Sequence, residues 1–230
     1  MTAGPTLTPR QRTLRAIAAT PALKAPRRAA LRASRLTWAT PRPVLVKRND
    51  LPHLLNARRL LGCGVEVGVK QGVFSEVLLA GWKGRHLISV DPWAETGEDY
   101  VNLDNVAQDV HDGFYAETRH RLARFGERST IWRMTGEEAA ARIPHHALDF
   151  VYLDARHDRA AVAEDLEAWF PKLRPGGILA GHDYIDGEFV NGEFGVRSAV
   201  DAFCAAHGLR VRATLTDSPW NSWYLIVPRT

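Results

Sequence analysis

The 230-residue sequence has no uninterrupted apolar run of about 18 residues, the length that a membrane-spanning helix needs. Its beginning also lacks the compact apolar segment of a secretory signal peptide. Cysteine is scarce, because only Cys63 and Cys204 occur, far apart in the chain. One lies in an expected strand and the other in an expected helix, so two reduced thiols are expected rather than a disulfide. These absences predict a cytoplasmic protein with no membrane span.

Acidic residues are almost absent from the first part of the chain. Residues 1–50 hold eleven Lys or Arg and a single acid, which gives this segment a net charge of +10. The remaining 180 residues carry 19 basic and 25 acidic side chains, a net charge of −6. A basic arm of this kind could contact nucleic acid, an anionic substrate or an acidic protein face, or simply be solvated. Trp38 is its only aromatic residue, so stacking on bases has little support.

The chain divides into a basic N-terminal helical extension over residues 1–60 and a larger domain over residues 61–230. In the larger domain, apolar strand patterns alternate with amphipathic helix patterns. The expected strands are residues 64–69, 86–91, 129–134, 148–154, 177–181, 210–216 and 222–227. The expected helices are residues 73–82, 107–125, 137–142, 158–173 and 195–207. This alternation predicts an α/β fold, a Rossmann-like αβα sandwich with helices on both faces of the sheet.

Ligands of such sheets bind beyond the carboxyl ends of the strands, and polar residues follow several of the expected strands. The turn from Glu66 to Gly72 is rich in glycine, which lets a ligand approach the backbone and the following helix. Its glycine spacing does not match the dinucleotide fingerprint. A carboxylate at Glu66 would repel a pyrophosphate but complement a cationic sulfonium. The turn therefore favours S-adenosylmethionine over NAD.

Asp91 ends the second expected strand, where a carboxylate can accept hydrogen bonds from both hydroxyls of a ribose. Thr135 and Gly136 follow the third strand and are expected near the adenine. For each of these residues a capping or turn role is the plain alternative. The residues expected to bind the cofactor are Glu66, Gly68, Gln71, Gly72, Asp91, Trp93, Thr135, Gly136 and Asp154.

Four segments carry a resemblance to a known family: Val65–Gly68, Ser89–Trp93, Leu148–His157 and Leu173–Tyr184. Over about residues 60–227 the sequence resembles class I S-adenosylmethionine-dependent methyltransferases. Within them it is similar to the small-molecule O-methyltransferases that act on sugars, a group that includes methylmannose-saccharide O-methyltransferases. The resemblance implies a seven-stranded, mostly parallel sheet of order 3-2-1-4-5-7-6 with strand 7 antiparallel.

In the related sugar O-methyltransferases, the acid that ends strand 4 and an acidic pair after strand 5 hold Mg²⁺. A histidine three residues past the strand-4 acid is the proposed general base. The resemblance thus implies a catalytic role for Asp154 and His157, with Asp154 and Asp183 as metal ligands. His182 stands where the relatives carry an acid, and imidazole favours softer metals. It could be a third ligand, for Mg²⁺ or more readily for Mn²⁺ or Zn²⁺, a substrate contact, a second base or an ordinary loop residue.

Two polar loops that contain aromatic residues, 92–115 and 184–195, are expected to border the site and to suit a sugar. We therefore expect a divalent-metal-assisted O-methyltransferase that acts on a hydroxyl of a saccharide or glycosylated metabolite. A homodimer is expected because short proline-broken helices rarely stay ordered alone. Three alternatives stay open: a nucleic-acid methyltransferase that uses the basic arm, a binding protein that has lost catalysis, and a nicotinamide dehydrogenase. Against the first, no Asn-Pro-Pro-Tyr-like or Pro-Cys motif follows strand 4. Against the second stand Asp154, His157 and Asp183 together, and Glu66 disfavours the third.

Overall fold

The computed structural model describes residues 45–95, 106–189, 192–217 and 220–229. The chain divides into two units, residues 1–44 and Leu45–Thr230, of which the second holds everything described below. Residues 1–44 of the expected helical extension lie outside the described residues. None of the helices in the described part of the chain is both long and apolar enough to cross a bilayer.

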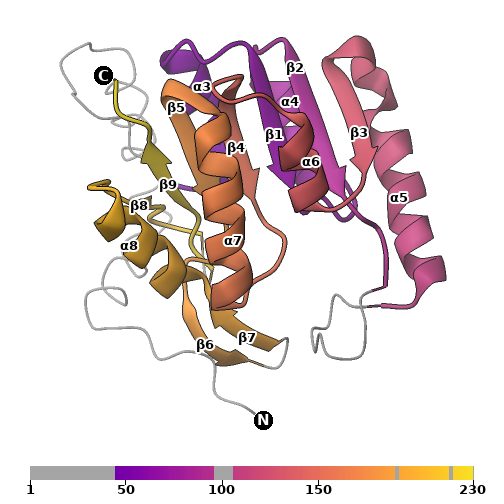
Figure 1. The fold of residues 1–230 in the computed structure, drawn as a ribbon. Helices are drawn as coiled ribbons and strands as arrows, with labels where there is room; N and C mark the ends of the chain where they lie inside the picture. Colours follow the sequence, from indigo (N-terminus) through magenta and orange to yellow (C-terminus); the bar gives the residue numbers. More distant parts are fainter. Residues whose placement is uncertain (1–44, 96–105, 190–191, 218–219, 230) are drawn as a thin grey trace, which may run out of the picture. The chain divides into compact units, whose positions relative to one another are not determined.

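A seven-stranded sheet forms the centre of the second unit (Figure 1). Its strands are β1 (Cys63–Val67), β2 (His86–Asp91), β3 (Ser129–Arg133), β4 (Leu148–Leu153), β5 (Leu173–Gly181), β8 (Arg212–Ala213) and β9 (Trp223–Ile226). They lie in the order β3-β2-β1-β4-β5-β9-β8. Strands β1 to β5 pair in parallel, whereas β9 is antiparallel to β5 and to β8. Numbered within this sheet alone, the order is the expected 3-2-1-4-5-7-6, so the predicted fold class is confirmed.

Helices cover both faces of the sheet, each over its own apolar cluster. On one face lie α6 (Gly136–Arg142), α7 (Arg159–Trp169) and α8 (Val196–Ala206); on the other lie α3 (Leu51–Ala57), α4 (Val73–Gly81) and α5 (Gln108–Leu122) (Figure 1). Three 3-10 turns, η1 (Arg48–Asp50), η2 (Ala123–Arg128) and η3 (Phe170–Lys172), adjoin these helices. All six residues of β4 are buried, as a central parallel strand requires.

A two-stranded hairpin lies where an irregular loop was expected. Strands β6 (Asp186–Phe189) and β7 (Gly192–Gly195) pair with each other and not with the main sheet. Phe189 and Phe194 contact the ring of Trp220, with ring centroids 4.9 and 5.1 Å away. The hairpin is therefore held in part by an aromatic contact with a segment some 30 residues later, which local sequence patterns do not reveal.

The compact unit begins at Leu45, earlier than the boundary expected at residue 61. Helix α3 explains the difference, because Leu51, Leu54 and Leu55 are buried in the cluster beneath α4. The side chain of Asn56 reinforces this packing by donating to the carbonyl of Gly81 at 2.8 Å. The segment from Leu45 onward is thus part of the folded domain.

We predict that Leu55→Ala destabilises the domain by ~2–5 kcal/mol, because it leaves a cavity in a fully buried position. Leu61 is 39% exposed, so Leu61→Ala should cost less than about 1 kcal/mol and serves as the control. Urea unfolding of both variants measures the difference. Equal, small losses for the two variants would mean that α3 does not belong to the cooperative unit.

Candidate functional site

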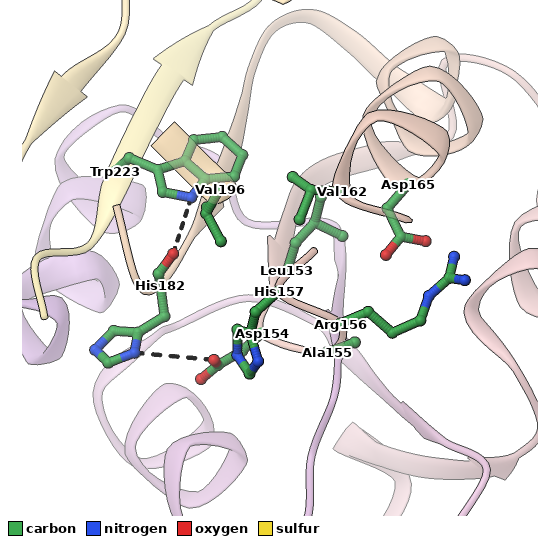
Figure 2. A pocket seen from close by; sticks show the side chains of 10 residues that line it. All are labelled: Leu153, Asp154, Ala155, Arg156, His157, Val162, Asp165, His182, Val196 and Trp223. Carbon is green, nitrogen blue, oxygen red and sulfur yellow. Dashed lines mark hydrogen bonds and ion pairs between the residues drawn. The ribbon is translucent and has the colours of Figure 1, made fainter. Parts of the chain in front are cut away.

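The site begins where two neighbouring parallel strands end together. In the β4–β5 pair, Leu153 is opposite Gly181, so the next residues, Asp154 and His182, emerge side by side. The backbone N–H of His182 donates to the Leu153 carbonyl at 3.1 Å. The carbonyl of His182 in turn accepts a hydrogen bond of 3.1 Å from the indole N–H of Trp223 on β9 (Figure 2). Three strands therefore fix the start of the loop that carries Asp183.

Two histidines and two aspartates meet at this point. Asp183 lies 2.8 Å from His182 (Oδ1 to Nδ1) and 3.0 Å from His157 (Oδ2 to Nε2). Asp154 Oδ1 is 3.9 Å from the same His182 nitrogen. Asp154, His182 and Asp183 each offer one ligand atom within 4.8 Å of the others, which is close enough to hold one metal ion. The structure thus brings together the three residues predicted to bind a metal.

The charges in this cluster depend strongly on one another. Burial tends to raise the pKa of Asp183, but hydrogen bonds from His157 and His182 outweigh it and hold that pKa well below its usual range. Burial likewise tends to lower the pKa of His182, but the bond to Asp183 and the charge of Asp154 reverse the effect and raise it. For Asp154 burial prevails and the pKa is raised. Asp183 is therefore the fixed negative charge of the cluster.

His157 is oriented by an aromatic neighbour as well as by Asp183. Its ring stacks on Phe194 of the hairpin, with ring centroids 4.5 Å apart. Its carbonyl accepts a hydrogen bond of 2.8 Å from the N–H of Gly195. Its Nδ1 is buried and has no hydrogen-bond partner among the described residues. His157, Asp154 and His182 line one pocket, together with Arg156 and Asp165 (Figure 2).

Asp165 belongs to this pocket but was not among the predicted site residues. It lies on α7, and burial raises its pKa to about 6. From the sequence alone, an acid within the first two turns of a helix cannot be told from an ordinary surface acid. A buried acid there becomes evident only when the facing residues are known.

The glycine-rich turn passes directly beside the cluster. Gly68 has a left-handed backbone (φ +86°), and a Cβ there would stand 2.1 Å from the carbonyl oxygen of Asp154. Only glycine permits that approach. The carboxylate of Asp91 accepts hydrogen bonds from the backbone N–H groups of Val69 and Lys70, both at 2.9 Å, and from that of Trp93 at 2.7 Å. Asp91 therefore holds the turn in place, in addition to any ribose it binds.

Several predicted cofactor residues support loops in this structure. Trp93 is fully buried and donates its indole N–H to the Lys70 carbonyl at 2.7 Å, so it packs inside the domain. Gln71 donates to the carboxylate of Glu117 at 3.0 Å. Thr135 caps the N-terminus of α6, which is the capping role considered for it as the alternative to cofactor binding. Gly72, at the start of α4 (φ +74°), lies against Thr118, and Gly136 lies against Val67.

Glu66 is placed beneath the turn rather than in open solvent. Its side chain points toward α4, where it accepts a hydrogen bond from Ser75, whose hydroxyl lies 2.8 Å from that of Ser89. Burial raises the pKa of Glu66 to about 8. The negative charge that the sequence-based prediction assigned to Glu66 is thus largely suppressed at neutral pH. What Glu66 contributes to cofactor binding stays a prediction.

One cation of the site was not anticipated as a functional residue. Arg48 was counted only as part of the basic arm, yet its Nη1 lies 3.3 Å from Asp154 Oδ2. Its guanidinium also stands 5.0 Å from the centre of the Phe74 ring. The contact spans more than a hundred residues of sequence, and no local signal marks it.

Comparison with known proteins gives one family match. The profile of a family described as "Methyltransferase domain" matches residues 65–184. Among curated proteins, the uncharacterized protein y4gI of Sinorhizobium fredii is 30% identical over 138 residues. That match covers 58% of this chain and spans only 14% of the relative's length.

Solved structures resemble this one in fold. A putative O-methyltransferase from Klebsiella pneumoniae matches with a TM-score of 0.57 at 14% identity, over 97% of this chain and 92% of its own. An O-methyltransferase from Bacillus cereus, in complex with SAH, matches with a TM-score of 0.55 at 13% identity, over 94% and 99%. The O-methyltransferase TomG from Streptomyces achromogenes, in complex with SAM, gives 0.53 at 15%, over 78% and 79%.

We predict that Glu66→Gln stabilises the domain increasingly as pH rises from about 5 to 8. The pKa of Glu66 is higher in the folded state (about 8) than its ordinary value of 4.5, so the wild type loses stability as pH rises through this window. The amide cannot ionise, and the gain should not exceed about 1.4 kcal/mol per pH unit. Denaturant unfolding at several pH values measures it. The exposed Glu188→Gln is the control, and a pH-independent gain would contradict the burial effect.

Proposed function

Because this chain belongs to the methyltransferase domain family, we propose that it is an S-adenosylmethionine-dependent O-methyltransferase assisted by a divalent metal. The observation that carries the proposal is the convergence of Asp154, His157, His182 and Asp183 beside the turn at Gly68. A methyl donor held by the turn and a hydroxyl held by the cluster would then meet at the ends of β1 and β4. Binding two reactants at one sheet edge is itself a large source of rate acceleration.

The reaction needs one proton acceptor and one methyl donor. The acceptor's hydroxyl oxygen forms a bond to the methyl carbon while the carbon–sulfur bond breaks, which releases S-adenosylhomocysteine. The hydroxyl proton passes to His157, the general base in this proposal. Asp183 and the Phe194 ring support that role, because they hold the imidazole in one orientation.

The donor set decides which ion suits the cluster. Two carboxylates and an imidazole fit a first-row transition ion such as Mn²⁺ at least as well as Mg²⁺, which prefers oxygen ligands alone. When bound, such an ion would supply positive charge that stabilises the developing negative charge on the acceptor oxygen. Asp154 and Asp183 would bind it through carboxylate oxygens, and His182 through Nδ1 if its hydrogen bond to Asp183 is exchanged for the metal.

For the acceptor we propose a saccharide or glycosylated metabolite. The aromatic residues of the hairpin region, Phe189, Phe194 and Trp220, form a connected set of rings that reaches His157. Phe194 is buried, whereas Phe189 and Trp220 are partly exposed. Partly exposed rings beside carboxylates suit a sugar, which has apolar faces and many hydroxyl groups. A homodimer and a cytoplasmic location remain predictions. Nucleic acid, the alternative acceptor, would require the basic arm and would show binding that weakens steeply with salt.

We predict that methyl transfer to a panel of sugars, measured with radiolabelled S-adenosylmethionine, falls at least tenfold after complete metal removal. Mn²⁺ or Mg²⁺ should restore it, with Mn²⁺ at least as effective because of His182. Asp183→Asn should lose activity that neither ion restores. Full turnover in the stripped protein would contradict the metal's role.

We also predict that His157→Ala lowers kcat by about 10²–10⁴-fold, since it removes the proton acceptor. His145 is an exposed histidine before β4, and His145→Ala is the matched control with wild-type turnover expected. Circular dichroism verifies that both variants fold. A His157→Ala protein with an unchanged kcat would exclude this histidine as the base.

A further inference from the structure

Arg48 and Asp154 form a pair of opposite charges at the edge of the proposed donor site. The atoms Arg48 Nη1 and Asp154 Oδ2 are 3.3 Å apart, and both side chains remain partly accessible, at 31% and 20%. The backbone of Gly68, in the glycine-rich turn, lies against the backbone carbonyl of the same Asp154. The pair is thus available to a ligand that lies along the turn.

The position of Arg48 is defined by contacts on both sides of its backbone. Its own N–H donates to the carboxylate of Asp217. Two residues earlier, the carbonyl of Val46 accepts from the N–H groups of Leu215 at 3.1 Å and Thr216 at 2.9 Å. The guanidinium rests over the ring of Phe74 at the start of α4. The guanidinium also interacts with the hydroxyl of Tyr152 on β4. Among the described residues, Asp154 and Tyr152 do not use all five of its N–H donors.

The methyl donor carries an α-amino acid end, with an ammonium and a carboxylate on one carbon. We propose that Arg48 binds the carboxylate of this amino acid end while Asp154 receives its ammonium. The inference rests on the proposed function and adds a specificity residue to it. When a zwitterion replaces the direct contact between Arg48 and Asp154, its carboxylate pairs with the arginine and its ammonium with the aspartate. Neither side chain then loses a partner of opposite charge. The Arg–carboxylate bond is charge-assisted and can be bidentate.

The two oxygens of Asp154 separate this role from metal binding. Oδ2 faces Arg48, whereas Oδ1 faces His182. The Oδ2 side therefore serves the methyl donor and the Oδ1 side serves the metal and the acceptor. Asp154 would join the two halves of the site through a single carboxylate.

The experiment compares two ligands that differ only in the carboxylate: S-adenosylhomocysteine and its decarboxylated analogue. Isothermal titration gives Kd for each with the wild type, Arg48→Gln and Arg48→Lys. We expect the wild type to prefer S-adenosylhomocysteine by about tenfold or more. Arg48→Gln should reduce that ratio to within about twofold, and Arg48→Lys, which keeps the charge but loses the planar fork, should be intermediate.

The matched control is Arg197→Gln, because Arg197 also lies near an aspartate, at 3.7 Å from Asp201, but is 60% exposed on α8. It should keep the wild-type ratio. Arg48→Gln weakening both ligands equally, or leaving their ratio unchanged, would overturn the inference and leave the proposed function standing. A wild-type protein that binds neither ligand would overturn the proposed function itself. Thermal unfolding of Arg48→Gln confirms that the variant folds, and Arg48→Lys decides the question if it does not.

Discussion

Strands β4 and β5 end level with each other, and the polar contacts of the site depend on that pairing. A Cβ at Gly181 would lie 2.6 Å from the Leu153 carbonyl oxygen and 2.6 Å from the Trp223 ring. The lack of a side chain at Gly181 therefore permits the close approach of β5 to β4 and β9. Beyond it, Asp183 takes a left-handed backbone (φ +52°) that is unfavourable for most side chains. That conformation is maintained by the two histidines that bind its carboxylate. Strain of this kind is typical of sites where several contacts must be made at once.

The glycine-rich turn is held in place by two acids in contrasting environments. Asp91 accepts the backbone N–H groups of Val69 and Lys70, which fixes the path of the turn, and also that of Trp93. Glu66 lies underneath, buried against two serines, and burial favours its neutral form. The turn beside Asp154 is thus supported by both acids, of which only Asp91 keeps a full charge at neutral pH. Arg48 offsets part of the remaining negative charge of Asp154.

Much of this arrangement could be predicted from local patterns. Alternating apolar segments predict the strands and their helices, and the rule that ligands bind at strand ends picks out Asp154, His182 and Asp183 together. The residues whose positions differ from the sequence-based expectation are those that depend on partners far away in the chain. Trp93 was expected to bind the cofactor, but its side chain is buried. The ring of Tyr115 on α5 lies beside it, with ring centroids 4.9 Å apart. Arg48 and the hairpin β6–β7 are likewise defined by contacts far along the chain, and the lowered charge of Glu66 is a property of its surroundings.

The indole N–H of Trp223 has a consequence for the order in which the site is completed. During synthesis, the residues that would bind the metal all leave the ribosome well before Trp223 does. Until β9 inserts beside β5, the carbonyl of His182 lacks the partner that orients it. A chain that has not yet added β9 therefore lacks this constraint on the backbone that leads to Asp183, although β4 and β5 can already pair. Maturation of the site is in this way coupled to completion of the fold.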